Sequence, residues 1–506
     1  MTLQQAIALH QHGKVAEAEA AYEQIIAAQP ANAAALSLFG LLLLNTGRID
    51  RAADVLARAV AANPADAAAQ ANLAAASKSL AAASLNSSAE LYRLGRFDEA
   101  LTASRAALAR DPDLIGAHAN AGLALYQLRR YWEAFAAFDR AVTLAPTDVD
   151  ALHYRGVCLF ALGRTEEALV SFERELALNP NRVMAHFDRA LCLLVIGRWA
   201  EGWAEYEWRK KRDDPLGIWT GDGTTWTGRE DLNGKILLIY AEQGFCDTLQ
   251  LCRYALRAEA KGARVVILAP PPLHRLLRTL SPMIAVTNST AGLGAIDYVC
   301  ATFSLPLAFI DQPIPDAVPY LHATPEAIAD WRARIGTEGF KIGVCWGVAK
   351  AKDSTRTFPL AGLVRLARLP SVRLISLQKG EELEQLATLS AGMTVELLGD
   401  DYDRGDFLDT AAVMANLDVV ISCDTSVANL AGALGYRTWV AVKHVAEWRW
   451  RPSGPTTPWY PTARVFRQKA QDAWDGVFIE MEQALHELLG AEPRSTQDAA
   501  RSLPIA

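Results

Sequence analysis

The chain has 506 residues, enough for roughly three domains at about 150 residues each. Hydrophobic residues make up 51% of the chain and charged residues 21%, which excludes an intrinsically disordered protein. The 50 basic and 57 acidic residues give a net charge of −7. No overall positive charge therefore favours nucleic acid or an anionic membrane, and a phosphate-bearing ligand needs a local site.

Seven cysteines are scattered along the chain, and none forms a CxxC pair. This pattern favours a reducing compartment and argues against a disulfide framework or structural zinc. The N-terminus lacks the basic and apolar pattern of a signal peptide, and the longest strongly apolar stretch, residues 36–44, is too short to cross a bilayer. We therefore expect a cytoplasmic protein without a bound metal.

Prolines recur along the first 180 residues with a constant period. The spacings are 34, 48, 34 and 34, between Pro30, Pro64, Pro112, Pro146 and Pro180. A second series keeps the same steps, with a glycine before Lys or Arg at Gly13, Gly47, Gly95, Gly163 and Gly197, and Arg129 in the missing place. The longer step predicts an insertion of 14 residues, the difference between 48 and 34, near the Ala- and Ser-rich residues 82–88.

Each repeat predicts a helical hairpin. In residues 147–180, apolar residues recur at helical spacing in two runs, Ala151, Tyr154, Cys158, Leu162 and then Ala168, Phe172, Leu176, Leu178. The proline that ends each unit cannot continue the second helix, because it lacks an N–H and clashes with the preceding turn. The period and its punctuation resemble the tetratricopeptide (TPR) repeat, with about six hairpins over residues 2–213.

An array of this kind leaves a concave groove lined by the first helices of the hairpins. The residue eight places after each proline is expected there, which gives Leu38, Asn72, Asn120, Tyr154 and Asp188. Asparagine in that place can hydrogen-bond the backbone of an extended peptide, although a merely solvated polar face explains the pattern equally well. Either way, hairpins of this type bind protein and carry no chemistry.

After residues 210–234, which break the period, the pattern changes to short apolar runs between helix-length segments. The runs cover residues 235–240, 264–269, 341–346, 372–377, 417–423 and 438–442. Such strands, alternating with helices, predict parallel sheets covered on both faces. The proline-rich residues 304–325 divide them into two lobes, and a last helix at 474–489 is expected to pack back on the first.

The predicted fold is therefore an α-solenoid followed by two Rossmann-like α/β lobes. The expected boundaries are a TPR array at 1–213, a first lobe at 214–325, a second lobe at 326–490 and a disordered tail at 491–506.

Ligands of open α/β sheets bind beyond the carboxyl ends of the strands, and two of these ends are rich in polar residues. Residues 241–248 follow the first strand and contain Glu242, Gln243 and Asp247. One of these carboxylates can act as general base on an acceptor hydroxyl. The alternative is that Asp247 and Thr248 only cap a helix predicted at 249–261.

The second polar strand end is Asp424, Thr425 and Ser426, between the strand ending at Cys423 and a helix predicted at 427–434. Hydroxyls and backbone N–H groups at a helix start can hold a phosphate. A plain capping box explains only one of the three residues, and it prefers Glu or Gln where Asn429 or a neighbour stands. These residues therefore predict a diphosphate site.

Two flanking loops add candidates for the same cleft. Arg356, in the polar loop 350–357, can reach a phosphate there or can be an exposed cation. Gln378 and Lys379, at the end of the strand 372–377, can contact a base or ribose or can be a solvated strand end.

Seven segments support a wider resemblance: EQGFCDTLQLCRY (242–254), FSLPLAF (303–309), VPYL (318–321), SLQKG (376–380), residues 406–435 around CDTS, EWRW (447–450) and PWYPTARVFRQ (458–468). Together they resemble bacterial TPR-containing glycosyltransferases related to the heptosyltransferases, a group that includes flagellin-modifying members. The resemblance implies a GT-B fold that needs no metal. It also implies that the second lobe binds the nucleotide-sugar and that the acceptor approaches from the first.

By position, the resemblance implies that Asp424, Thr425 and Ser426 contact the donor diphosphate and sugar. Arg356 resembles the basic phosphate contact, and Asp247 the catalytic base. Two positions depart from the family pattern, with Cys246 where the family usually has Gly and Asn429 where it usually has His. Trp448, Arg449, Trp450 and Tyr460 are typical of the family and are interpreted as packing between the lobes.

The function predicted from these features is inverting transfer of a sugar to Ser or Thr of a protein held by the TPR array, with flagellin as one candidate. The donor is a CMP-, UDP- or GDP-linked sugar, and no other cofactor, nucleic acid or membrane is involved. The alternative is a catalytically inactive GT-B relic that acts as a TPR scaffold or chaperone. A third option, transfer to a lipid-linked saccharide, leaves the hairpins unexplained.

Overall fold

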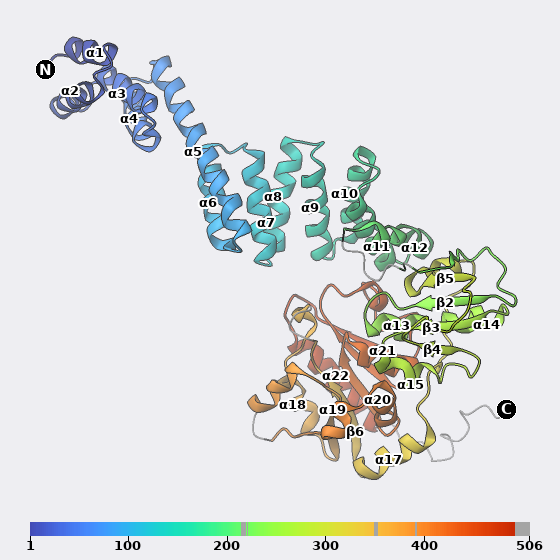
Figure 1. Ribbon diagram of the computed structural model, residues 1–506. Coiled ribbons are helices and arrows are strands. Elements are labelled where there is room, and N and C mark those ends of the chain that lie inside the picture. The colour runs from blue at the N-terminus through green and yellow to red at the C-terminus, as the bar shows by residue number, and fades with distance from the viewer. Residues whose placement is uncertain (214–218, 220, 349–352, 390–391, 491–506) are drawn as a thin grey trace. The chain divides into compact units, whose positions relative to one another are not determined.

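The computed structural model describes residues 1–213, 219, 221–348, 353–389 and 392–490 (Figure 1). The disordered tail predicted at 491–506, and parts of the predicted boundary and of the polar loop 350–357, lie outside these residues. The chain divides into two compact units, Met1–Asn181 and Arg182–Ala506, which are described in turn.

The first unit is a stack of helical hairpins, which confirms the predicted solenoid. Its helices are α1 (Leu3–Gln11), α2 (Val15–Ala28), α3 (Ala33–Asn45), α4 (Ile49–Ala62), α5 (Ala67–Arg93), α6 (Phe97–Arg110), α7 (Ile115–Gln127), α8 (Tyr131–Leu144), α9 (Val149–Ala161) and α10 (Thr165–Leu178). The turns inside the hairpins hold a glycine at positive φ, and Arg129 takes the same conformation, with φ of 60°, where the series lacks glycine.

Close packing inside each hairpin depends on small residues in the first helix. A Cβ added at Gly122 of α7 would lie 2.6 Å from the Phe138 ring of α8, and Gly156 of α9 faces Phe172 of α10 in the same way. A side chain at these glycines would push the two helices apart, so the repeat requires glycine or a local rearrangement.

The 14 extra residues lengthen a helix and do not form a loop. Helix α5 has 27 residues, whereas α3, α7 and α9 have 13 each. Its first part packs with α3 and α4, and its later part with α6 and α7. One hydrophobic core accordingly ends near Leu73 and the next begins near Leu91. Helix α5 therefore joins two shorter stacks end to end (Figure 1).

The second unit begins with the sixth hairpin, α11 (Val183–Ile196) and α12 (Trp199–Tyr206), followed by the 3₁₀ helix η1 (Glu207–Lys211). Trp199 and Trp203 of this hairpin pack edge-on against Trp448 and Trp459 of the second α/β lobe, with ring centroids 5.1–6.5 Å apart. The hairpin thus follows the repeat period but is part of the α/β unit.

Two fully parallel sheets follow, as predicted. The first has the order β1-β5-β2-β3-β4, from β1 (Thr224–Thr225), β2 (Ile236–Tyr240), β3 (Arg264–Leu268), β4 (Ala285–Thr287) and β5 (Tyr298–Ala301). The second has the order β11-β10-β9-β6-β7-β8, from β6 (Phe340–Cys345), β7 (Val372–Ser376), β8 (Val395–Glu396), β9 (Val419–Cys423), β10 (Thr438–Val442) and β11 (Ala463–Arg467).

The first sheet is accompanied by α13 (Phe245–Leu251), α14 (Tyr254–Ala260), η2 (Pro271–Leu273), α15 (His274–Leu277), η3 (Thr302–Ser304) and α16 (Leu305–Ala308). The second is accompanied by α17 (Pro325–Ile335), η4 (Ser354–Arg356), η5 (Leu360–Leu363), α18 (Val364–Ala367), η6 (Glu381–Thr388), α19 (Asp400–Arg404), α20 (Phe407–Met414), α21 (Ser426–Ala433), η7 (Trp448–Trp450) and α22 (Asp475–Gly490).

Two sequence expectations need correction. The helix predicted at 249–261 is two helices, α13 and α14, and it starts earlier, at Phe245. The final helix, α22, does not pack on the first lobe. It packs on η5, α18 and β11, and the apolar side chains Phe478 and Met481 belong to the core of the second sheet.

Candidate active site

Both sheets place their polar loops where the direction of strand order reverses. In the first sheet, the chain runs from β2 outward to β4 and returns to β5 on the other side of β2. In the second, it runs from β6 outward to β8 and returns to β9 on the other side of β6. Crevices at the carboxyl ends of such strands are the usual ligand sites of α/β sheets. The loop with Asp247 follows β2, and Asp424 follows β9.

Asp247 lies in the first turn of α13 and uses both carboxylate oxygens. Oδ2 accepts a hydrogen bond from the Gly244 backbone N–H at 3.1 Å, so Asp247 supplies one half of a capping box, and the glycine has no side chain to supply the other half. Oδ1 accepts from Nη2 of Arg449 at 2.7 Å, so a residue of the second lobe reaches the first. Asp247 thus does cap the helix start through Oδ2, as the alternative interpretation expected. Its ion pair with Arg449 is not explained by capping.

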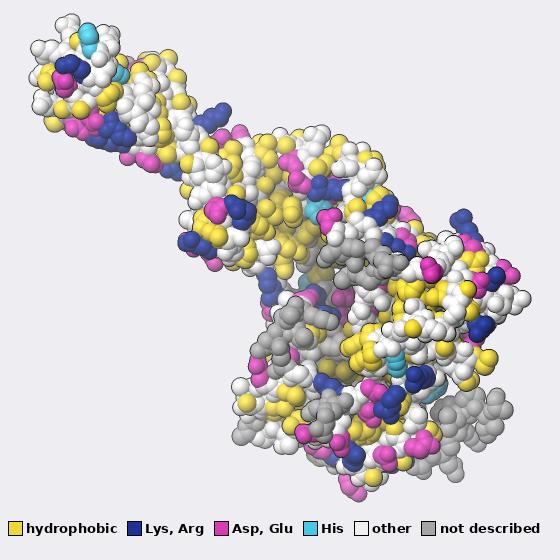
Figure 2. All heavy atoms as spheres, in the orientation of Figure 1, with side chains coloured by type: hydrophobic (Ala, Val, Ile, Leu, Met, Phe, Trp, Pro, Cys, Tyr) yellow, Lys and Arg dark blue, Asp and Glu magenta, His cyan; other side chains and the backbone are white. Residues whose placement is uncertain are grey.

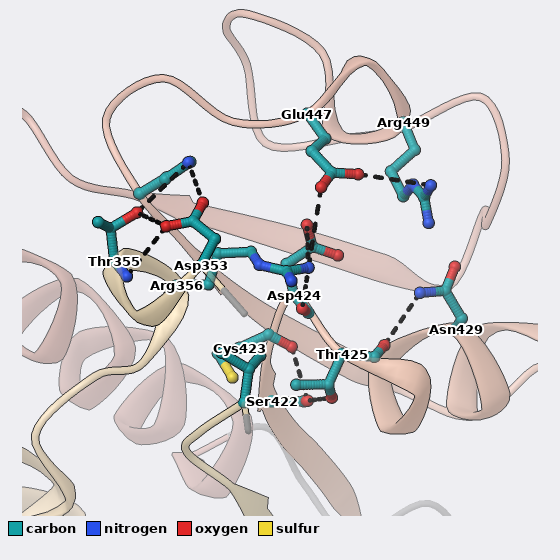
Figure 3. Close-up of polar contacts among 12 residues, drawn as sticks. Asp353, Thr355, Arg356, Ser422, Cys423, Asp424, Thr425, Asn429, Glu447 and Arg449 are labelled. Atoms are coloured by element: carbon teal, nitrogen blue, oxygen red, sulfur yellow. Dashed lines mark hydrogen bonds and ion pairs between the residues drawn. The ribbon is translucent and has the colours of Figure 1, made fainter. Parts of the chain in front are cut away.

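Asp424 is a buried carboxylate beside the start of α21. Its Oδ2 lies 3.8 Å from Nη1 of Arg356, and its Oδ1 has no hydrogen-bond partner among the described residues. Burial and the nearby Glu447 carboxylate raise the pKa of Asp424 to about 6, against the opposing effect of Arg449 and Arg356. Figure 3 shows the Arg356 guanidinium between Asp424 and Glu447.

The start of α21 is capped by Thr425, whose Oγ1 accepts from the Val427 N–H at 3.2 Å and contacts Ser422 Oγ at 2.9 Å. Ser426 is the first residue of the helix, one place earlier than predicted. Arg356, in η4, donates to the Asp424 carbonyl at 3.2 Å. The structure therefore brings together Arg356, Asp424, Thr425 and Ser426.

Glu447 and Arg449, which flank Trp448, complete the cluster. Glu447 lies 3.7 Å from Arg356 and 3.4 Å from Arg449, so one carboxylate contacts both guanidinium groups (Figure 3). Burial alone would lower the pKa of Arg449, but Asp247, Glu447 and Asp424 outweigh it and hold that pKa well above its ordinary value. Arg449 is therefore a permanent buried cation.

Cys246 stands next to Asp247 within this charged environment. Burial and the Asp247 carboxylate raise the pKa of the Cys246 thiol to about 12. The thiol is protonated at neutral pH and is not an activated nucleophile.

Three predicted donor contacts have their polar groups bound to the chain itself. Asn429 is fully buried, donates to the Thr425 carbonyl at 2.9 Å and accepts from the Tyr460 hydroxyl at 2.9 Å. Gln378 accepts from the backbone N–H groups of residues 346 and 347 and donates to the carbonyls of residues 347 and 379. Lys379 donates to the Gly405 carbonyl and lies over the Tyr402 ring.

The loop residues Glu242 and Gln243 face the sixth hairpin. Glu242 is buried and pairs with Arg209 of η1 at 2.8 and 3.0 Å, and it also accepts from the Phe303 N–H. Gln243 donates to the Tyr206 hydroxyl at 3.2 Å. These contacts anchor the loop that carries Asp247 to the end of the hairpin, a role that the sequence pattern did not indicate.

The expected groove positions do not form one polar ladder. Asn120 donates to Ser88 Oγ of α5 at 2.9 Å, and Tyr154 stacks on Phe138 at 5.3 Å. Leu38 and Asn72 are half-buried, on α3 and α5. Asp188 lies on α11, in the second unit. Figure 2 shows apolar side chains gathered over α7–α9, where the partly buried residues include Leu123 and Tyr126.

Sequence reasoning missed the roles of Arg209, Glu447 and Arg449. The EWRW motif contained the signal, but its aromatic residues favoured an interpretation as packing. Trp448 does pack in the tryptophan cluster, while its two charged neighbours form ion pairs with each other, with Asp247 and with Arg356. In the described parts of the chain, no helix is long and apolar enough to span a membrane. Those same parts hold no cluster of three or more His, Cys, Asp or Glu suited to a metal ion.

Comparison with known proteins agrees with the division of the chain near residue 181. Tetratricopeptide-repeat models match residues 3–67, 38–84, 88–149 and 149–182. Protein FlbA of Caulobacter vibrioides is 27% identical in an alignment of 316 residues, which covers 56% of this chain and 52% of FlbA. The chain therefore spans about half the length of this relative.

Solved structures that resemble part of the chain are TPR proteins. The first TPR of Spaghetti (RPAP3), bound to an HSP90 peptide, is 26% identical and covers 23% of this chain and 91% of its own, with a TM-score of 0.23. YrrB, a TPR protein with an unusual peptide-binding site, is 18% identical over 38% of this chain and 91% of its own, with a TM-score of 0.23. A TPR protein from Parabacteroides merdae is 19% identical over 42% and 79%, with a TM-score of 0.22.

Residues 3–182 are thus an array of TPR repeats, a type of array that implies a peptide or protein partner. The chain continues into an α/β region, and it has distant similarity to FlbA.

Proposed function

We propose that the protein is a glycosyltransferase that moves a sugar from a nucleotide-sugar to a Ser or Thr hydroxyl of a protein held by the TPR array. The observation that carries the proposal is the cross-lobe cluster at the two strand-order reversals. It sets the carboxylate of Asp247 opposite a capped helix start with Arg356 and Asp424. Sequence similarity to the flagellin-modifying group of transferases, noted above, supports the same assignment and makes flagellin the first acceptor to test.

In the proposed reaction, the hydroxyl oxygen of the acceptor attacks the anomeric carbon of the donor sugar. Its proton passes to Asp247, and the bond between the anomeric carbon and the phosphate oxygen breaks. The bonding electron pair leaves with the nucleotide phosphate, so the configuration at the anomeric carbon inverts. Arg356 and the N–H groups at the start of α21 stabilise the departing phosphate, and such electrostatic stabilisation is usually the largest contribution to catalysis.

The first test is a transfer assay. Purified protein is incubated with flagellin from the same cells and a panel of CMP-, UDP- and GDP-linked sugars, and intact-mass spectrometry follows the acceptor. We expect a mass increase of whole sugar residues with one donor. Asp247→Asn should slow transfer roughly 10²- to 10⁴-fold, the usual effect of removing a general base.

Asp409→Asn is the matched control for that variant. Asp409 also accepts from a backbone N–H at a helix start, that of Asp406 at 3.2 Å, and from an arginine of the other lobe, Arg275, at 3.1 Å, but it lies outside the cluster. Its transfer rate should equal that of the wild type. No transfer with any donor, or equal rates in both variants, would count against the proposal.

A second candidate is a non-catalytic GT-B relic that serves as a protein scaffold. The protonated thiol of Cys246 beside Asp247 and the fully buried Asn429 favour it, since both depart from the family pattern. A ligand present at a hundred times its Kd stabilises a protein by about 2.7 kcal/mol. A thermal shift with CMP, UDP or GDP therefore supports the enzyme, and no shift with any of them supports the relic.

A further inference from the structure

The cluster between the lobes contains more negative than positive groups. Its carboxylates are Asp247, Asp424 and Glu447, and its cations are Arg356 and Arg449. Glu447 is the most accessible of the five, with its side chain 39% exposed, and it contacts both guanidinium groups. One partly exposed anionic group thus already bridges the two arginines.

Arg449 is a buried arginine that makes two ionic contacts within the cluster. Its side chain is 5% exposed, and its Nη2 donates to Asp247 at 2.7 Å and lies 3.4 Å from Glu447. Its Nε is buried and makes no hydrogen bond within the described part of the chain. An arginine with an unused buried donor can form a second, parallel hydrogen bond, the fork geometry that phosphate oxygens accept.

We propose that Arg449 is the second cationic ligand of the donor diphosphate and that its two carboxylate partners are internal competitors for it. The inference rests on the proposed function, since it concerns the same nucleotide-sugar site. A phosphate oxygen that binds Arg449 takes the place of Asp247 Oδ1, and a neighbouring one takes the place of Glu447 between the two arginines. Glu447 can turn toward solvent, because its side chain is already partly exposed.

The exchange of Arg449 from Asp247 to the donor phosphate links donor binding to the availability of the catalytic base. The Asp247 oxygen that accepts from Arg449 is not open to an acceptor hydroxyl in that direction, and Oδ2 is used by the Gly244 N–H. When Arg449 moves to the phosphate, Oδ1 becomes available for the proton of the acceptor. Asp247 therefore becomes an effective base only after the donor has bound, which predicts ordered binding with the donor first.

The test measures the binding of inorganic pyrophosphate by isothermal titration calorimetry, with EDTA present, to the full chain. If Asp247 competes for Arg449, Asp247→Asn should bind pyrophosphate about tenfold more tightly than the wild type. Arg449→Gln should bind it roughly 10- to 100-fold more weakly, the equivalent of one hydrogen bond to a charged group. In the Arg449→Gln background, Asp247→Asn should give no further gain.

The last comparison separates a direct exchange from a general effect of charge. A gain from Asp247→Asn that persists without Arg449 would overturn the proposal, and so would no gain in Asp247→Asn alone. Should Arg449→Gln fail to fold, Arg449→Lys takes its place, and a full tenfold gain in that background would count against the fork geometry. Asp409→Asn again serves as the control and should leave pyrophosphate affinity unchanged.

These outcomes are distinguishable from a failure of the proposed function. If pyrophosphate binds as expected but no sugar is transferred, the exchange at Arg449 stands and the transferase assignment fails. If sugar is transferred but Asp247→Asn does not change pyrophosphate affinity, the transferase assignment stands and the exchange fails.

Discussion

Asp424 shows how burial changes the chemistry of a single residue. The side chain is buried beside a helix start, where water cannot solvate its charge, and the Glu447 carboxylate adds to the cost. Two arginines reduce this cost without removing it, so the pKa of Asp424 is raised to about 6.

The raised pKa of Asp424 predicts a pH effect on stability. The folded protein holds this proton up to about pH 6, whereas an unfolded Asp loses it near pH 4. Folding stability from this group is therefore present at low pH and lost as the pH rises through 6, by up to about 3 kcal/mol. Asp424→Asn should remove that loss.

Urea unfolding of the wild type and of Asp424→Asn at pH 4.5 and pH 7.5 checks this prediction. The stability of the variant relative to the wild type should increase by about 2 kcal/mol between the two pH values, because about 1 kcal/mol of the effect is already lost at pH 4.5. Equal pH dependence in both proteins would mean that Asp424 is ionised in the folded state over the whole range.

At the scale of elements, a buried arginine at the junction of α13 and α14 links the two lobes over a wide set of contacts. Arg253 is 2% exposed. It donates to the carbonyls of Gln250, Pro315 and Trp459 and to the Tyr320 hydroxyl, with distances of 2.7–2.8 Å. Its guanidinium also lies over the Tyr320 and Tyr460 rings. One side chain thus ties the first lobe to the linker and to the second lobe.

Removal of Arg253 should destabilise the second unit strongly. Arg253→Ala leaves three carbonyls and a hydroxyl without their donor, and we expect a loss of about 3 to 5 kcal/mol in the unfolding of this unit. Differential scanning calorimetry measures it. Arg257→Ala is the comparison, since Arg257 donates to one carbonyl of the same linker, Pro313, from a more exposed position. That variant should cost roughly 1 kcal/mol, and equal losses would refute the special role of Arg253.

The whole molecule divides at residue 181, inside the repeat period. The sixth hairpin supplies two of the four tryptophans that pack together in the second unit, and its Arg209 pairs with the buried Glu242. The α/β region therefore contacts this hairpin through both aromatic and ionic side chains. We propose that residues 182–506 are the folding unit, in place of the boundary expected near 213.

Two fragments test this proposal. Residues 182–506 should unfold cooperatively, because they retain the tryptophan cluster and the Arg209–Glu242 pair. Residues 214–506 lack the sixth hairpin, which leaves Glu242 buried without its cation, a cost of about 3 to 5 kcal/mol, and exposes the faces of Trp448 and Trp459. We expect this fragment to aggregate or to unfold without a clear thermal transition, as followed by circular dichroism. Equal cooperativity of both fragments would place the boundary after the hairpin.

Local patterns in the sequence were sufficient for much of this architecture. The 34-residue period predicts the hairpins because each repeat is formed by contacts near in sequence, and the apolar runs predict the parallel strands. Short strands such as β5 were missed, since four residues carry too little periodicity to be recognised. The length of the insertion was predicted correctly from the repeat spacing. No local sequence pattern, however, distinguished an inserted loop from the continuous helix α5.

The sequence by itself determined the repeats, the strand pattern and the polar loops after β2, β6 and β9, because backbone propensity and side-chain periodicity act over a few turns. Only the tertiary structure decided how those loops combine. Asp247 and Arg449 are 202 residues apart, and their contact depends on the packing of two lobes. The tertiary structure also decided that the side chains of Asn429 and Gln378 hydrogen-bond to other groups of the chain. Burial and hydrogen-bond satisfaction depend on distant neighbours, which no local pattern identifies.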